Sequence, residues 1–233
     1  MEAQVGLFDI KEVPPLEIQH LGFIKIGNID FYITETHLAT WIIMGILITF
    51  AVIVRVNLNK FKDVPKGLQN VTEAMIEAFD KFVKNSAGEK MMWVGNWYFM
   101  AFAFLLLSNI GGLFWLRNPT ADWTMTFAFE FVTFILIEYM NIRTRGRKFL
   151  LSMLNPLDLI GELARPVSLS FRLFGNILAG MILMTLLYTV TPFFIRFLVP
   201  IPLHFFFDVF AGGLQAFVFC VLSLSFIGTA AKE

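Results

Sequence analysis

The chain has 233 residues, of which 57% are hydrophobic and only 15% charged, and its mean hydropathy is +0.71. Soluble domains contain about 45–50% apolar and about 25% charged residues, so this composition excludes an ordinary soluble enzyme. The 18 basic and 18 acidic residues balance to a net charge of zero, which leaves no positive surplus for binding nucleic acid.

The N-terminal 37 residues are predicted to form an extracytoplasmic segment, followed by a membrane domain over residues 38–233. Residues 1–19 contain acids, a lysine and two prolines but no apolar core, so we expect no cleavable signal peptide. The first membrane helix, over residues 38–56, must then itself direct insertion.

Five long runs carry few or no charges, and each is near the length of about 20 residues that a transmembrane helix needs. We predict membrane-embedded helices over residues 38–56, 91–116, 122–142, 150–190 and 197–230. The predicted fold class is therefore all-α: a polytopic membrane protein with five membrane-embedded helices plus one amphipathic surface helix.

The amphipathic helix is predicted over residues 68–84, after the Pro65-Lys66-Gly67 break. Its apolar side chains recur at helical spacing, and a charged stripe lies opposite them. The apolar set is Leu68, Val71, Met75, Phe79 and Phe82, and the charged set is Glu73, Glu77, Asp80 and Lys84. The pattern fits a helix on the cytoplasmic membrane surface and, equally well, a solvent-facing helix packed on the other spans.

Orientation follows from the basic residues of the short loops. Lysine and arginine gather in residues 55–90 and 143–148, whereas the turns near residues 117–122 and 192–202 hold one arginine each. We therefore expect a multi-pass protein of the cell membrane, with both basic loops and the C-terminus cytoplasmic and the N-terminus outside.

No catalytic motif of the metalloprotease, P-loop or serine-hydrolase type occurs in the sequence. The three histidines, His20, His37 and His204, lie in separate regions, and the single Cys220 excludes a disulfide and a cysteine-based zinc site. We predict no metal, no cofactor and no catalytic residue.

Ionisable residues inside the membrane remain as the functional candidates, since each costs at least about 2.5–3.5 kcal/mol at a helix centre. They are Glu130, Glu138, Arg172 and Asp208, with the polar residues Asn109, Asn176, His204 and Gln215 at similar depth.

Arg172 keeps its charge in any protein environment. Ser168, Arg172, Asn176 and the Ala179-Gly180 pair follow one another at helical spacing, which predicts a small, polar, basic face that another helix approaches closely. The alternative is a structural arginine paired with Asp158 or Glu162.

The last helix repeats this design. His204, Asp208, Gly212, Gln215 and Phe219 share one face, and such a file of polar groups binds or relays an ion. The alternative is that Asp208 only tethers its helix to a neighbour. With the prolines between them, the last two helices are expected to form a hairpin that meets a partner within the membrane.

The stretch R-P-V-S-L-S-F-R-L-F-G-N-I-L-A-G, residues 165–180, resembles the signature of subunit a of F-type ATP synthases. Four further blocks resemble the family in the same order, so that the likeness covers most of the chain from about residue 38. They are V-P-K-G-L-Q-N at 64–70, P-T-A-D at 119–122, N-P-L-D-L-I-G-E at 155–162 and L-Q-A-F-V-F at 214–219.

The resemblance implies a non-catalytic stator subunit with two offset half-channels that pass H⁺ or Na⁺ to and from a rotating c-subunit ring. The last two helices would form a long tilted hairpin around that ring. The other implied partners are the peripheral stalk b subunits and membrane lipid.

The resemblance also assigns residues. Arg172 matches the essential arginine that faces the ring carboxylates, Asn176 its polar neighbour, and Gln215 the glutamine that meets the arginine from the last helix. Asp122 is expected at the outer mouth.

Two positions depart from the family pattern. Met181 stands where many members carry an acid or histidine, and Asp208 where many carry histidine or glutamate. We therefore expect the outer half-channel to use Asp208, with His204 beside it, and Glu130 to approach the same cavity from the preceding hairpin.

A secondary transporter or intramembrane anion-binding protein using Arg172 is the alternative function. Transporters of that kind show internal repeats, and none is visible in this sequence.

Overall fold

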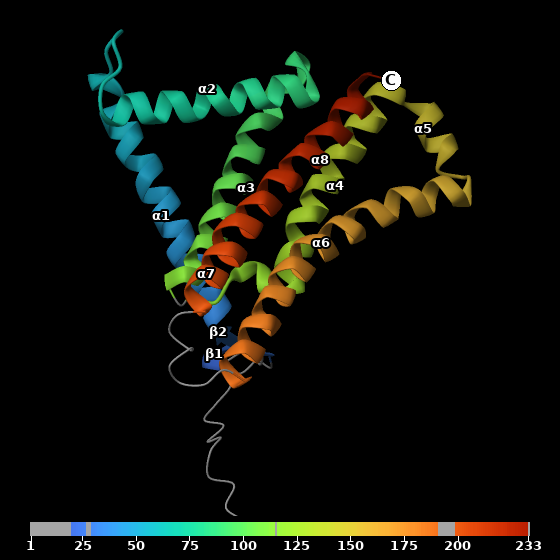
Figure 1. Ribbon diagram of the computed structural model, residues 1–233. Helices are drawn as coiled ribbons and strands as arrows, with labels where there is room; N and C mark the ends of the chain where they lie inside the picture. The colour runs from blue at the N-terminus through green and yellow to red at the C-terminus, as the bar shows by residue number, and fades with distance from the viewer. Residues whose placement is uncertain (1–19, 27–28, 115, 191–198, 233) are drawn as a thin grey trace, which may run out of the picture.

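A computed structural model describes residues 20–26, 29–114, 116–190 and 199–232 of the chain. Five of its helical segments are long and apolar enough to cross a membrane, which confirms the predicted all-α polytopic fold (Figure 1). They are Glu35–Lys60, Glu89–Phe114, Trp123–Arg145, Pro156–Val190 and Pro200–Ala231.

The helices are α1 (Glu35–Asn57), α2 (Leu68–Ala87), α3 (Met92–Gly111), α4 (Trp123–Arg145), α5 (Arg147–Ser152) and α6 (Pro156–Val190). The last membrane segment consists of α7 (Pro200–His204), a π-helical stretch (Phe205–Ala211) and α8 (Gly212–Lys232). The predicted turn residue Pro192 lies outside the described residues.

The predicted helix over residues 150–190 is wrong at its start, because α5 ends at Ser152 and α6 begins only at Pro156. Proline lacks a backbone N–H and disfavours helical geometry in the residue before it. Asn155 then caps the new helix, since its side-chain oxygen accepts a hydrogen bond from the Leu157 amide at 3.2 Å.

A β-hairpin precedes α1, and the sequence analysis did not predict it. Strands β1 (His20–Ile26) and β2 (Ile29–Thr34) pair antiparallel, with Ile26 opposite Ile29. The Gly27-Asn28 dipeptide between two apolar-rich runs was the available sequence signal, because such pairs favour two-residue hairpin turns.

Helix α8 lies at the centre of the bundle and packs against α2, α3, α4 and α6. Its side chains Phe219, Leu224 and Ile227 are fully buried together with Tyr98 and Leu105 of α3. Figure 1 shows the C-terminus and α2 at one end of this bundle and the strands at the other. We call these the α2 end and the β-hairpin end.

Helix α2 combines the two arrangements that the sequence left open. It runs crosswise over the bundle (Figure 1), and Val83 and Ala87 in its second half are buried in the core. In its first half, however, Val71, Met75 and Ile76 are about half exposed. The second half of α2 therefore joins the hydrophobic core of the spans, whereas the first half buries only the polar Gln69 and Thr72 and presents an apolar surface.

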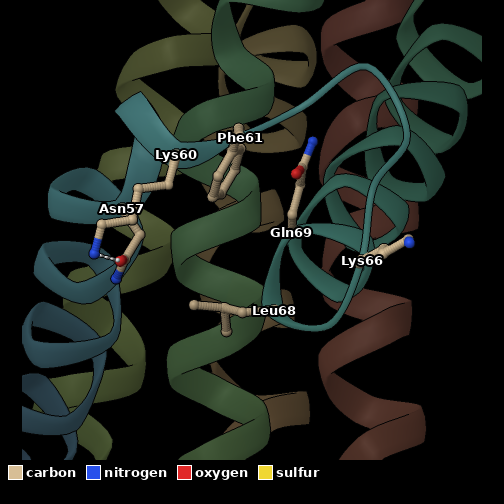
Figure 2. Close-up of a pocket in the computed structure, with 6 residues that line it drawn as sticks. All are labelled: Asn57, Lys60, Phe61, Lys66, Leu68 and Gln69. Atoms are coloured by element: carbon tan, nitrogen blue, oxygen red, sulfur yellow. Dashed lines mark hydrogen bonds between the residues drawn. The ribbon is translucent and has the colours of Figure 1, made fainter.

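A shallow open pocket lies where α1 meets α2 (Figure 2). It is lined by Asn57, Lys60, Phe61, Lys66, Leu68 and Gln69. Gln69 holds the connecting segment in place: its side chain accepts from the Lys62 amide at 3.0 Å and donates to the Lys62 carbonyl at 2.6 Å. These two hydrogen bonds to the backbone of Lys62 fix where α2 starts relative to α1.

The closest helix contact at the α2 end predicts a stability effect. A Cβ atom on Gly228 would lie 2.9 Å from Ala87 Cα and from the Ser86 carbonyl oxygen, both backbone atoms, whereas one on Gly213 would meet only Leu106 Cδ1, at 3.6 Å. Gly228→Ala should lower the free energy of unfolding by about 1–3 kcal/mol, measured by thermal unfolding in detergent. Gly213→Ala is the matched control, and equal stability of the two variants would contradict this contact.

Candidate functional site

Helix α6 carries the intramembrane arginine on its outer surface. Figure 1 shows α6 changing direction along its length, and Pro166 lies inside the helix, where proline removes a backbone hydrogen bond and kinks the chain. Beyond this point Ser168, Arg172 and Ala179 are all exposed. The predicted small, basic face is therefore present and is not covered by the described part of this chain.

Arg172 makes no hydrogen bond and no ion pair with any residue that the structure describes. The alternative that it pairs with Asp158 or Glu162 is wrong, because both acids have other partners. Asp158 accepts from the Asn155 side chain at 3.3 Å, and Glu162 pairs with Arg165. The Arg172 guanidinium is thus an exposed cation without a partner in the described chain.

One member of the predicted face lies elsewhere. Gly180 is buried, and a Cβ atom there would be 3.2 Å from the Phe207 ring of the π-helical stretch. Gly180 therefore serves the contact between the last two membrane segments, whereas Asn176 is half-buried beside the exposed face. Among the described residues, neither Asn176 nor Gln215 of α8 hydrogen-bonds to Arg172.

The structure joins two predicted residues to a third that the sequence analysis missed. His204 Nδ1 lies 2.8 Å from Asp208 Oδ2, and His204 Nε2 lies 3.2 Å from the Tyr188 hydroxyl oxygen. With Asp208 ionised, Nδ1 donates to the carboxylate and Nε2 accepts from the tyrosine. Tyr188 is on α6, on the other side of the turn, so no sequence spacing could have indicated it.

The Tyr188–His204–Asp208 group lies partly open. The side chains of His204 and Asp208 are 34% and 22% exposed, and the Asp208 carboxyl packs where Gly112 leaves room for it. Asp208 sits within the π-helical stretch, a wide turn that is common at functional sites. The group forms a continuous hydrogen-bonded line from α6 to the last membrane segment.

A buried polar network fixes the segment after α3. The Asn109 side chain donates to the Gly212 carbonyl at 2.8 Å and accepts from the Asn118 side chain at 2.7 Å. Four residues further, Asp122 forms a mostly buried ion pair with Arg117 at 3.7 Å. Asp122 is thus held at the start of α4, and the network ties this turn to the start of α8.

Glu130 is not part of the Tyr188–His204–Asp208 group, so the expectation that it shares their cavity is wrong. It is 1% exposed and lines a narrow gap between α4 and α6, beside Arg165, Pro166 and Leu169. The sequence placed Glu130 on a helix face but gave no information on which helix that face would meet.

The part of the chain that the structure describes contains no group of three or more His, Cys, Asp or Glu residues able to hold a metal ion. The described residues include an unpaired cation, Arg172, on a membrane helix. They also include the hydrogen-bonded Tyr188–His204–Asp208 group and, separate from it, the buried carboxyl group of Glu130. Such an arrangement suits ion transfer through a membrane.

Comparison with known proteins gives the family. The model of the family described as ATP synthase A chain matches residues 37–228. The chain belongs to this family, subunit a of the ATP synthase. It is therefore a multi-pass component of an F-type ATP synthase membrane sector and acts as its stator ion-channel subunit.

Three subunit a relatives are similar over most of their length. A sodium ion specific subunit a of Propionigenium modestum is 33% identical, covering 86% of this chain and 75% of the relative. A chloroplastic subunit a of Oedogonium cardiacum is 32% identical, covering 97% of this chain and 92% of the relative. Subunit a of Moorella thermoacetica is 33% identical, covering 92% of this chain and 95% of the relative.

Proposed function

We propose that the chain is the non-catalytic half of an ion-translocating motor: it provides two half-channels that pass H⁺ to and from a rotating ring of c subunits. The observation that carries this proposal is the Arg172 guanidinium, exposed on a membrane helix and unpaired in the described chain. A permanent cation in that setting requires an anionic partner, and a ring carboxylate supplies one.

The face around Arg172 suits a moving partner. Ser168 and Ala179 are small and exposed, and a Cβ atom on Gly175 would meet nothing within 4 Å. Small side chains let a second helix approach closely in the membrane. Arg172 would favour the ionised ring carboxylate as it passes and bar direct leakage, with Asn176 and Gln215 as polar neighbours on the two helices that flank this route.

The first half-channel is proposed to run through Asp208, His204 and Tyr188, with Asp122 at its mouth. The hydrogen bonds that join Tyr188, His204 and Asp208 support protons as the ion. A histidine between a carboxylate and a hydroxyl group is able to accept a proton on one ring nitrogen and release one from the other.

We further propose that the α2 end faces the cytoplasm, with residues 1–37 outside and residues 38–233 forming the membrane domain of the cell membrane. The basic loops support this orientation. Helix α1 and the exposed apolar start of α2 would contact membrane lipid and the b subunits of the peripheral stalk, because little of α1 is covered within this chain.

The alternative of a secondary transporter that binds anions through Arg172 has less support. No internal repeat occurs in the sequence, and the three relatives described above are each named as subunit a.

The orientation is tested by sided labelling. With Cys220→Ala as background, Arg145→Cys should react with an impermeant thiol reagent only in inverted vesicles. Its labelling in intact cells would overturn the orientation, and Phe114→Cys, at an exposed position of the opposite end, serves as the opposite-side control.

Loss of the permanent cation should stop coupling. Arg172→Ala should abolish ATP-driven proton pumping by the assembled complex, and Arg172→Lys should also be severely impaired because a lysine at membrane depth, unlike an arginine, is able to lose its proton. Arg143→Ala, which removes an exposed arginine that donates to Tyr139 on α4, is the matched comparison. ATP synthesis at a normal rate in Arg172→Ala complexes would disprove the proposed role.

The first half-channel depends on a titratable group at position 208. Asp208→Asn should slow proton flow in both directions by about 100-fold while the complex stays assembled. Asp208→Glu or Asp208→His should restore part of the flow, and Tyr188→Phe should slow it less, since the His204–Asp208 contact survives. Unchanged flow in Asp208→Asn vesicles would mean that Asp208 only tethers its helix.

A further inference from the structure

Glu130 is a buried acid that the first half-channel does not use. Both of its carboxyl oxygens lack a hydrogen-bond partner among the described residues, and the side chain is 1% exposed. It faces the gap between α4 and α6, where Arg165, Pro166 and Leu169 form the opposite wall. An unpartnered carboxylate in so dry a place carries a large desolvation cost, and taking up a proton removes that cost.

A second unpartnered carboxyl oxygen lies on the same helix. Glu138 is about two turns beyond Glu130 toward the α2 end, and its Oε1 is also buried without a hydrogen-bond partner in the described residues. Its carboxyl group is close enough to Glu162 and Arg165 of α6 for their charges to act on it, and Asn141 is the remaining polar neighbour.

Two guanidinium groups act on these acids: that of Arg172 on Glu130, and that of Arg165 on Glu138 and Glu162. Arg165 donates to Glu162, and its charged group also lies 5.3 Å above the ring centre of Phe226 on α8. It reaches the Glu130 gap on one side and the Glu138–Glu162 pair on the other. Since one cation compensates one negative charge, these three acids exceed the two arginines that act on them, and at least part of the set is more stable with protons bound.

The antiparallel packing of α4 and α6 puts these groups in a row. Thr126 lies 3.3 Å from Ser170, Glu130 lies beside Pro166 and Leu169, and Glu138 lies near Glu162. Arg172 follows Ser170 by two residues on α6, and its charge acts on the Glu130 carboxyl. The row therefore starts at the α2 end and finishes beside Arg172.

We infer that Glu162, Glu138 and Glu130 form a proton relay from the solution at the α2 end to the Arg172 face. This inference rests on the proposed function and supplies its second half-channel. In each step an O–H bond breaks at the donor and forms at the accepting carboxylate; because about two helical turns, or about 12 Å, separate Glu138 from Glu130, that step requires a chain of water molecules between them. The set regains its starting charge once the proton has moved on, so no other reactant is needed.

The ligand of this relay is a proton and not a metal cation. A hard cation takes several oxygen ligands, whereas Glu130 faces a wall formed by an arginine, a proline and a leucine. The other titratable groups near Glu130 are Arg172, Tyr98 and Cys220, which add one further cation and two neutral donors.

The test uses the complete ATP synthase in liposomes. Glu130→Gln and Glu138→Gln should each reduce ATP-driven proton pumping by about 100-fold, and Glu130→Asp and Glu138→Asp should recover part of it. Glu77→Gln is the matched control, because Glu77 is an exposed acid paired with Lys81 on α2. Normal pumping in both glutamine variants would overturn the relay.

Sidedness separates a relay from a structural role. The residual pumping of Glu138→Asp should change with the pH of the solution at the α2 end and not with the pH on the other side, whereas Asp208→Glu should show the reverse. A Glu138→Asp rate that ignores the pH at the α2 end would also overturn the relay. If Arg172→Ala complexes pump normally, the proposed function itself fails; if they do not pump and the glutamine variants do, only the relay fails.

Discussion

The cost of placing charge in a membrane organises this structure. An ionisable side chain in a hydrocarbon environment must be paired, neutralised or turned toward a partner. Two arginines are paired with acids: Arg117 with Asp122 and Arg165 with Glu162. Arg172 forms no ion pair within the described chain. This difference between Arg165 and Arg172, two turns apart on one helix, is what supports the proposal that Arg172 is the functional cation.

Packing of small residues keeps the polar groups in place around that cation. Gly180 admits the Phe207 ring, Gly112 admits the Asp208 carboxyl, and Gly212 lies against the Asn109 side chain. Each contact brings a helix with a polar residue close to its neighbour, so the polar groups are positioned by shape as much as by hydrogen bonds. A larger side chain at any of these glycines would move a functional residue.

The sequence predicted the spans well because a membrane helix depends on a local property, the length of its apolar run. It also predicted that His204 and Asp208 share a face, since four residues make about one turn. It did not predict the break before Pro156 within an otherwise apolar pattern, nor the strands before Glu35. Tyr188 and the position of Glu130 required knowledge of which helices are neighbours, and periodicity gives the face of a helix but not its partner.

The two sets of titratable groups differ in their hydrogen bonding and in their exposure. Tyr188, His204 and Asp208 are joined by hydrogen bonds and partly open, so a proton entering there finds a connected path. Glu130 is fully enclosed and lacks a hydrogen-bond partner among the described residues, so under the proposed relay a proton would be held there until the next group accepts it. One charge crossing 100 mV gains about 2.3 kcal/mol, which is similar to the cost of about 2.5–3.5 kcal/mol for a charge at a helix centre. A continuous line of connected groups across the whole membrane would dissipate that energy as leakage. In the proposed function the fixed charge of Arg172 stands between an open set and an enclosed one, so that a proton would cross only when a moving carboxylate carries it past.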